Sequence, residues 1–246
     1  GARRLQGGSV TDTELHAMIA GRSGSPVDLG TASDFWRLAP DERILTATGD
    51  SLTALCSVPS DYVDAVVTDG PFSSGGMFRG DRAQSTITKY VRNGVVSAGL
   101  DFCGDTRDQK SFMHWASLVF AECHRIVRQG GVLCAFSDWR QLGATQDAMQ
   151  AGGFVMRGVV VWDKTEASRP RIGGFRSQCE FIVWGSRGPL HERNDVGCLD
   201  GCFRFRRNHG EDRIHQTGKP VPLMESLVRI CPPGGIVLDP FMGSGS

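Results

Sequence analysis

The chain has 246 residues, of which 40% are hydrophobic and 22% are charged. This length predicts one compact domain with room for a small insertion. The 27 basic and 27 acidic side chains cancel, which excludes a globally basic nucleic-acid coat but not a local basic patch. The sequence has no run of about 18 apolar residues, so we expect no membrane span. Eight scattered cysteines indicate reduced core residues of a cytoplasmic protein.

The regular part of the sequence begins at residue 43, and residues 1–42 are assigned to an N-terminal extension. Strands are predicted at 44–47, 63–68, 132–136, 154–162, 180–184 and 236–238, and helices at 108–129, at 139–150 and from 219 onward. Strands that alternate with helices predict an α/β fold with a mostly parallel sheet and helices on both faces. Such sheets bind their ligands at the carboxyl ends of the strands.

One unusual segment, Asp69-Gly70-Pro71-Phe72, follows the buried strand 63–68. Chemistry on the exocyclic amino group of a nucleobase needs acceptors for two N–H protons and a flat apolar surface for a base taken out of its stack. A carboxylate, a backbone carbonyl and an aromatic ring supply these groups here. An ordinary turn after a strand explains the same residues equally well when this segment is taken alone.

A second unusual segment, Asp239-Pro-Phe241-Met-Gly243-Ser-Gly245, follows the last predicted strand. Its glycines allow a ligand to approach the backbone closely, and Asp239 can accept hydrogen bonds from an ammonium group. These properties suit the amino-acid end of S-adenosylmethionine. The segment lacks the third glycine of a dinucleotide fingerprint and the lysine of a phosphate loop. An ordinary glycine-rich turn is the alternative interpretation.

Together the two segments resemble the DNA amino-methyltransferases, which modify adenine N6 or cytosine N4. These enzymes have a catalytic tetrapeptide close to Asp-Pro-Pro-Tyr and a Phe-x-Gly-x-Gly cofactor motif. The catalytic motif comes first here, which resembles the circularly permuted β group with its class I, Rossmann-like fold. The resemblance covers about residues 43–246, and further matching segments are Thr48-Gly49-Asp50, 161–164, 179–183 and 215–220.

The resemblance implies a role for each matching residue. Asp69, Gly70, Pro71 and Phe72 would hold the target base. The expected cofactor is S-adenosyl-L-methionine, and its expected contacts are Asp50, Thr217, Lys219, Asp239, Phe241, Gly243 and Gly245. Asp50 would contact its adenine, and Thr217 and Lys219 would lie near its carboxylate, where the start of a helix also favours an anion.

This sequence departs from the family pattern in two places. Gly70 stands where proline is usual, which loosens the position of its carbonyl, and Phe72 stands where tyrosine is frequent. The family also continues past its Gly-x-Gly with a helix and another strand, so the C-terminal part of the domain is expected to be missing.

The expected partner is double-stranded DNA, and a homodimer is a further expectation from related enzymes. Two irregular segments carry arginines without many acids, and the small insertion around 186–213 is expected to recognise the target sequence. A zinc site at His191, Cys198, Cys202 and His209 has loose spacing, so no metal is expected. The candidate DNA contacts are Arg79, Arg82, Arg169, Arg171, Arg176, Arg204, Arg206 and Arg207.

The sequence therefore predicts a site-specific DNA methyltransferase, with adenine N6 preferred because an aspartate opens the tetrapeptide. Three alternatives stay open. They are methylation of cytosine N4, a weakened relative that binds cofactor or DNA without efficient methylation, and a different Rossmann-like enzyme that uses another nucleotide. A prokaryotic or phage restriction-modification context is also expected.

Overall fold

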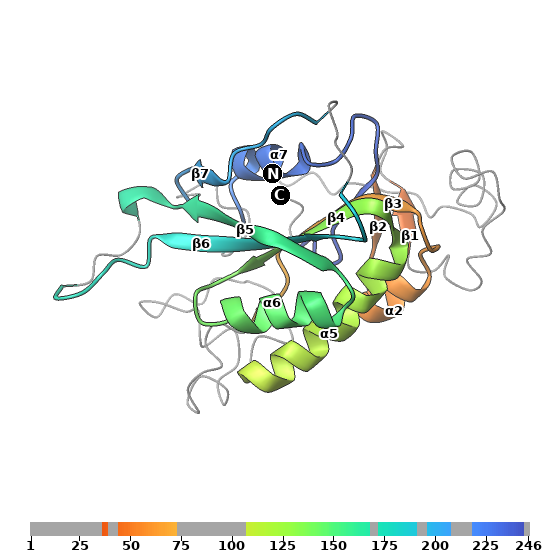
Figure 1. Ribbon diagram of the computed structural model, residues 1–246, viewed down its shortest axis with the longest axis horizontal. Helices are drawn as coiled ribbons and strands as arrows, with labels where there is room; N and C mark the ends of the chain where they lie inside the picture. The colour runs from red at the N-terminus through yellow and green to blue at the C-terminus, as the bar shows by residue number, and fades with distance from the viewer. Residues whose placement is uncertain are drawn as a thin grey trace, which may run out of the picture.

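The computed structural model describes residues 36–38, 44–72, 107–167, 172–190, 196–207 and 218–243. These residues form a six-stranded sheet with helices on both faces (Figure 1). Two short strands, β1 (Trp36–Leu38) and β2 (Leu45–Ala47), pair antiparallel in a separate sheet. Among the described residues, no helix has both the length and the apolar character needed to cross a membrane.

The six-stranded sheet has the order β7-β5-β6-β4-β3-β8. Its strands are β3 (Val63–Thr68), β4 (Val127–Ser137), β5 (Val155–Asp163), β6 (Cys179–Ser186), β7 (Cys202–Arg204) and β8 (Val237–Leu238). β3 is parallel to β4 and to β8, and β5 is parallel to β7. Only β6, among the described strands, runs antiparallel to both of its neighbours. The mostly parallel α/β architecture predicted from the sequence is thus confirmed.

The strand directions give the sheet one edge of special interest, which we name the carboxyl edge. There β3, β4, β5, β7 and β8 end, and the antiparallel strand β6 begins. Ligands of open α/β sheets bind at this edge. Both segments that the sequence singled out follow strands that end here, so the topology brings them to the same side of the molecule.

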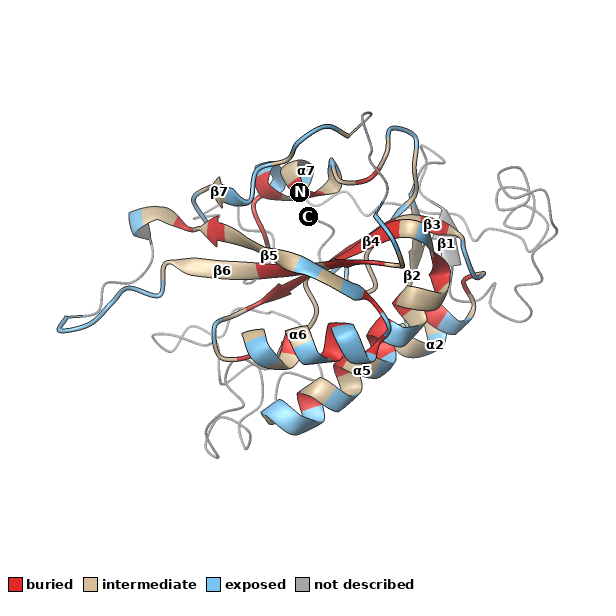
Figure 2. Cartoon of the chain, in the orientation of Figure 1, coloured by how far each residue is buried: buried red, intermediate tan, exposed pale blue. Residues whose placement is uncertain are grey.

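Helices cover the two faces of the sheet. α5 (Gln109–Ile126) and α6 (Leu142–Ala151) lie on one face, and α7 (Val221–Val228) lies on the other (Figure 1). The central strands are buried on both sides, as the red segments of Figure 2 show. One core packs Phe112 and Val119 of α5 against β3 and β4, and the other packs Leu223 and Leu227 of α7 against Trp162. The short helix α2 (Ser51–Cys56) lies beside α5.

The boundary between α5 and β4 differs from the predicted one. Asp108 caps α5, because its side chain accepts a hydrogen bond from the backbone N–H of Ser111 at 2.9 Å. The helix ends at Ile126, however, since Val127 already pairs with Val63 of β3. Gly131 lies inside β4 rather than beyond a helix. A Cβ there would lie 2.7 Å from the backbone oxygen of Asp64, so only glycine fits this close approach.

The start of α6 also differs from the prediction. A turn separates β4 from the helix, which begins at Leu142 instead of near Trp139. The side chain of Asp138 accepts hydrogen bonds from the backbone N–H groups of Arg140 and Gln141, at 2.9 and 3.1 Å. These bonds hold the chain in a turn, so Trp139 stays at the surface at the carboxyl edge.

Candidate active site

The two unusual segments lie side by side. β3 and β8 are neighbouring parallel strands, and each segment continues directly from one of them. The hydroxyl Oγ1 of Thr68 donates a hydrogen bond of 2.8 Å to Oδ1 of Asp239, which joins the two strand ends across 171 positions of sequence. The segments Asp69–Phe72 and Asp239–Gly243 therefore lie next to each other.

An apolar cleft opens between these strand ends and α5. Trp115 and Phe241 meet there with ring centroids 5.5 Å apart, and Phe72 packs against the cores on both faces of the sheet. The described residues that line the cleft are Thr68, Gly70, Pro71, Phe72, Phe112, Trp115, Ala116, Val119, Phe120, Ala135, Phe136, Thr145 and Phe241. These walls are mostly apolar and partly aromatic.

Asp239 is a half-buried carboxyl group at the tip of β8. It accepts hydrogen bonds from Thr68 and from the backbone N–H of Phe241, at 2.8 and 2.9 Å. Burial raises the pKa of Asp239 from 3.8 to about 6, and the nearby charge of Asp69 acts in the same direction. A cationic ligand beside Asp239 would relieve this burial penalty, so the chemistry of the site favours an ammonium group.

Asp69 is held by a lysine from a distant part of the chain. Nζ of Lys219, just before α7, donates a hydrogen bond of 2.6 Å to Oδ2 of Asp69. The same ammonium lies 3.5 Å from Oε2 of Glu180, which is also paired with Lys164 at 3.1 Å. In the described structure, the ammonium group of Lys219 therefore contacts the catalytic candidate Asp69. The role of Lys219 toward a cofactor carboxylate stays a prediction.

The structure describes some of the remaining candidate cofactor residues. Asp50 caps α2 by accepting a 2.9 Å hydrogen bond from the backbone N–H of Thr53. Its neighbour Ser51 donates a hydrogen bond from Oγ to the carbonyl of Pro240 at 2.9 Å, which holds α2 beside the second segment. Gly243 has a positive φ of 58°. Thr217 and Gly245 lie outside the described residues.

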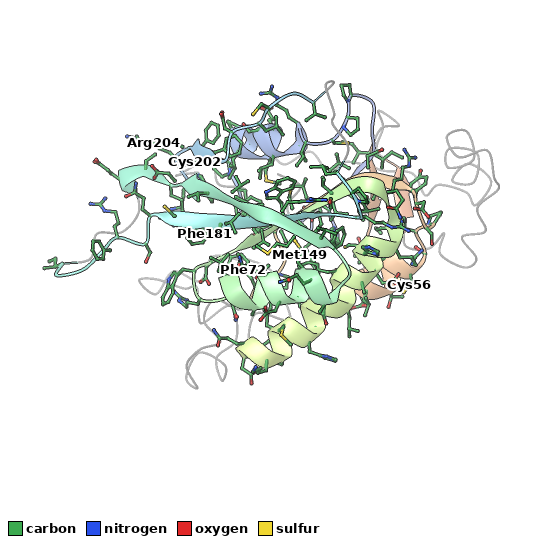
Figure 3. The ribbon with its side chains drawn as sticks, viewed as in Figure 1. Cys56, Phe72, Met149, Phe181, Cys202 and Arg204 are labelled. Atoms are coloured by element: carbon green, nitrogen blue, oxygen red, sulfur yellow. The ribbon has the colours of Figure 1, made fainter. Side chains whose placement is uncertain are left out.

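Four of the candidate DNA-contacting arginines are described, and all four are exposed. Arg204 lies on β7 at the margin of the sheet (Figure 3), where its Nε is 3.5 Å from Asp163. Arg206 and Arg207 follow the stacked rings of Phe203 and Phe205, whose centroids are 6.4 Å apart. These groups lie at the carboxyl edge, as does Arg176 before β6. Arg79, Arg82, Arg169 and Arg171 lie outside the described residues.

The structure describes two of the four residues that were considered as a zinc site. His191 and His209 lie outside the described residues, and Cys198 and Cys202 are exposed. Within the described ranges, no group of three or more histidine, cysteine, aspartate or glutamate side chains could hold a metal ion.

Sequence reasoning misses several residues of the site. The helical pattern indicates a core role for Trp115, and its contact with Phe241 shows that it forms a wall of the cleft. The pattern around Glu180 indicates only a strand. An acidic residue inside the apolar run Cys179–Trp184 is the available signal, because a buried carboxylate needs a charged partner.

Comparisons with known proteins agree with this geometry. Residues 63–246 match the DNA methylase family of N6 and N4 methyltransferases. YubD of Escherichia coli (strain K12) is 29% identical over 202 residues, which cover 80% of this chain and 75% of YubD. The type II methyltransferase M.BglII of Bacillus subtilis is 24% identical over 243 residues, which cover 80% of this chain and 59% of M.BglII.

A solved structure shares the fold. The DNA modification methylase TTHA0409 of Thermus thermophilus, in complex with S-adenosyl-L-methionine, has a TM-score of 0.51 and 18% sequence identity. The similarity covers 80% of each of the two chains. The fold is that of a class I methyltransferase, with the catalytic segment ahead of the cofactor segment.

The fold and the paired strand ends define an S-adenosylmethionine-dependent methyltransferase of nucleobase amino groups. The chain belongs to the N6/N4 DNA methylase family, because the match spans most of its length. Enzymes of this family transfer the methyl group of S-adenosylmethionine to an exocyclic amino group in DNA.

Proposed function

We propose that this chain methylates N6 of adenine in double-stranded DNA, with its catalytic groups at the end of β3. The observation that carries this proposal is the junction of β3 and β8, where Gly70–Phe72 and Phe241 line one apolar cleft. The preference for adenine rests on the aspartate that opens the tetrapeptide, which is a tendency of the family. Methylation of cytosine N4 is the second candidate, because the family includes both activities.

The described residues fit S-adenosylmethionine as the cofactor. Asp239 offers a half-buried carboxylate for its ammonium group, and Phe241 and Trp115 offer aromatic walls. Asp50 and Gly243 lie beside the same strand end, and Thr217, Lys219 and Gly245 are the further candidates from the resemblance. When bound, the cofactor supplies an electrophilic methyl group on its sulfonium.

Asp69, Gly70 and Phe72 perform the protein's part of the reaction in this proposal. The carboxylate of Asp69 and the carbonyl of Gly70 accept the two N–H protons of the amino group and so orient its nitrogen. Both oxygens stabilise the positive charge that develops on that nitrogen. Phe72 stacks on the base after it leaves the duplex, and Pro71 fixes the backbone between the acceptor and the ring.

The arginines of the carboxyl edge are proposed to bind the phosphates of the duplex. Arg206 and Arg207 are exposed next to two stacked phenylalanine rings, which is a suitable arrangement for phosphate contact and base stacking. The proposed contacts are Arg79, Arg82, Arg169, Arg171, Arg176, Arg204, Arg206 and Arg207. A homodimer and a cytoplasmic location in a prokaryotic host are also part of the proposal.

Nucleoside analysis of cellular DNA tests the proposed product. The full-length protein is expressed in cells without endogenous DNA methylation, and the DNA is digested and analysed by mass spectrometry. We expect N6-methyladenine in the wild type and none in Asp69→Ala. A signal of N4-methylcytosine alone would replace adenine by cytosine, and the absence of both would favour the weakened relative suggested by Gly70.

A further inference from the structure

Four charged side chains from four parts of the chain meet at the carboxyl edge. Asp69 follows β3, Lys164 follows β5, Glu180 lies on β6, and Lys219 precedes α7. The ammonium of Lys219 contacts Asp69 at 2.6 Å and Glu180 at 3.5 Å, and Lys164 contacts Glu180 at 3.1 Å. The four charges form a chain in the order Lys164, Glu180, Lys219 and Asp69, and their sum is zero.

The burial of this cluster makes its pairing obligatory. The side chains of Lys219 and Lys164 are only 8% and 10% exposed, and an unpaired buried ammonium would carry a large desolvation cost. Asp69 and Glu180 raise the pKa of Lys219 above its ordinary value despite the burial. The two lysines hold the pKa of Glu180 below its ordinary value, although burial alone would raise it. Lys219 and Glu180 therefore stay charged.

Lys219 is also fixed by aromatic rings of the cleft. Its Nζ lies 5.8 Å from the ring centroid of Phe72 and 5.0 Å from that of Phe136. Both distances fall within the range of cation–π attraction. One ammonium group thus contacts the carboxylate and the ring of the same tetrapeptide, which links the two parts of the base site to each other.

We propose that Lys219 and Glu180 are positioning residues for methyl transfer: Glu180 anchors the ammonium of Lys219, and Lys219 sets the orientation of Asp69 and Phe72. The proposal rests on the proposed function and gives Lys219 a task at the nucleobase. A hydrogen bond at Oδ2 restricts rotation of the Asp69 carboxyl group, so the acceptor geometry is fixed before the base arrives. A displacement of about 1 Å at such a group can cost about a hundredfold in rate.

Three variants of the full-length enzyme test the proposal through kcat and KM. Lys219→Met is expected to lower kcat about a hundredfold. Glu180→Gln is expected to lower kcat about tenfold, with KM for S-adenosylmethionine changed less than about twofold. Lys219→Arg keeps the charge and recovers part of kcat. Glu122→Gln is the matched control, because Glu122 pairs with Arg125 within α5 and, among the described residues, has no contact with the four charged groups. If folded Lys219→Met and Glu180→Gln keep the kcat of the wild type, the proposal is wrong.

A titration of Asp69 supplies a readout that does not need an active enzyme. The charged groups that face Asp69 are Lys219, Glu180 and, at the tip of β8, Asp239. Loss of the ammonium in Lys219→Met moves the titration of the Asp69 carboxyl, followed by carbon NMR, to higher pH. An unchanged titration in Lys219→Met overturns the proposal. A wild type that gives the expected titrations but labels no DNA overturns only the proposed function.

Discussion

The ring of Phe241 packs against the α-carbon of Gly70, so that a Cβ at position 70 would lie 2.9 Å from Cδ2 of that ring. The two residues belong to the two segments that define the cleft. Glycine at position 70, where related enzymes usually have proline, therefore allows Phe241 to lie directly on the catalytic segment. The departure from the family pattern has a steric consequence as well as a conformational one.

Gly70→Ala tests this contact. The added methyl group forces the Phe241 ring to move, and we expect the free energy of unfolding to fall by about 1–3 kcal/mol, as in other overpacked sites. Urea denaturation measures the change. In a Phe241→Leu background the smaller side chain leaves room, so the same substitution should cost much less. Equal costs in the two backgrounds would contradict the contact.

The pKa of Asp239 predicts how cofactor binding depends on pH. The folded-state pKa of about 6 lies above the ordinary value of 3.8, so the protonated form is favoured in the free protein. The stability that this proton gives is present below about pH 4 and is lost as the pH rises through 6. An ammonium ligand needs the ionised form, so binding should strengthen over the same range.

Calorimetry with S-adenosylhomocysteine from pH 5 to 8 measures whether binding strengthens as the pH rises. We expect the affinity to rise by up to about tenfold per pH unit below 6 and to level off above it. Thr68→Val removes a hydrogen bond to the carboxylate and should move the midpoint upward. Asp239→Asn should bind weakly at every pH. An affinity that falls as the pH rises from 5 to 7 would contradict this account of Asp239.

Most strands could be predicted from the sequence because they depend on local patterns, and the topology places the ends of β3 and β8 together. The sequence did not predict that α5 would end at Ile126. That helix pattern continues through Val127, and only the pairing of Val127 with Val63 overrides it. The helical propensity of this segment depends on neighbouring residues and does not depend on a strand partner that lies 64 positions away in the sequence.

The contacts within the charged cluster could not be predicted from the sequence, for a related reason. Lys219 and Glu180 lie in separate motifs, and neither spacing nor periodicity indicates that Asp69 is their common neighbour. The resemblance implies cofactor contacts for Lys219 and Asp50, and both stay predictions. The described contacts of Lys219 are with the catalytic segment, and Asp50 caps α2.

Phe72 is expected to contribute through stacking. Phe72→Leu keeps an apolar side chain in the cleft but removes the aromatic face, which contributes about 1–3 kcal/mol per stacked base. We therefore expect kcat/KM for DNA to fall by about 5- to 150-fold, with the affinity for S-adenosylhomocysteine unchanged. Phe72→Tyr retains the ring and should stay within about twofold of the wild type. Steady-state kinetics with duplex DNA that contains the target site distinguishes the two variants.

Arg206 and Arg207 are expected to contact phosphates. Each lost phosphate contact makes the slope of log Kobs against log salt concentration less negative by about 0.9. The double replacement by alanine should therefore reduce the slope by about 1.8, as measured by fluorescence anisotropy. Arg229→Ala is the control, because this exposed residue follows α7 near the opposite edge of the sheet. An unchanged slope in the double variant would remove both arginines from the DNA interface.

The most direct measurement of the central claim is the transfer of a tritiated methyl group from S-adenosylmethionine to duplex DNA by the full-length wild type and by Asp69→Ala. The account predicts labelled DNA with the wild type. It predicts a loss of at least about a thousandfold with Asp69→Ala, which removes the acceptor that stabilises the developing charge. Binding of S-adenosylhomocysteine should be retained. Undiminished transfer by folded Asp69→Ala would contradict the assignment of the cleft as the place where the base is methylated.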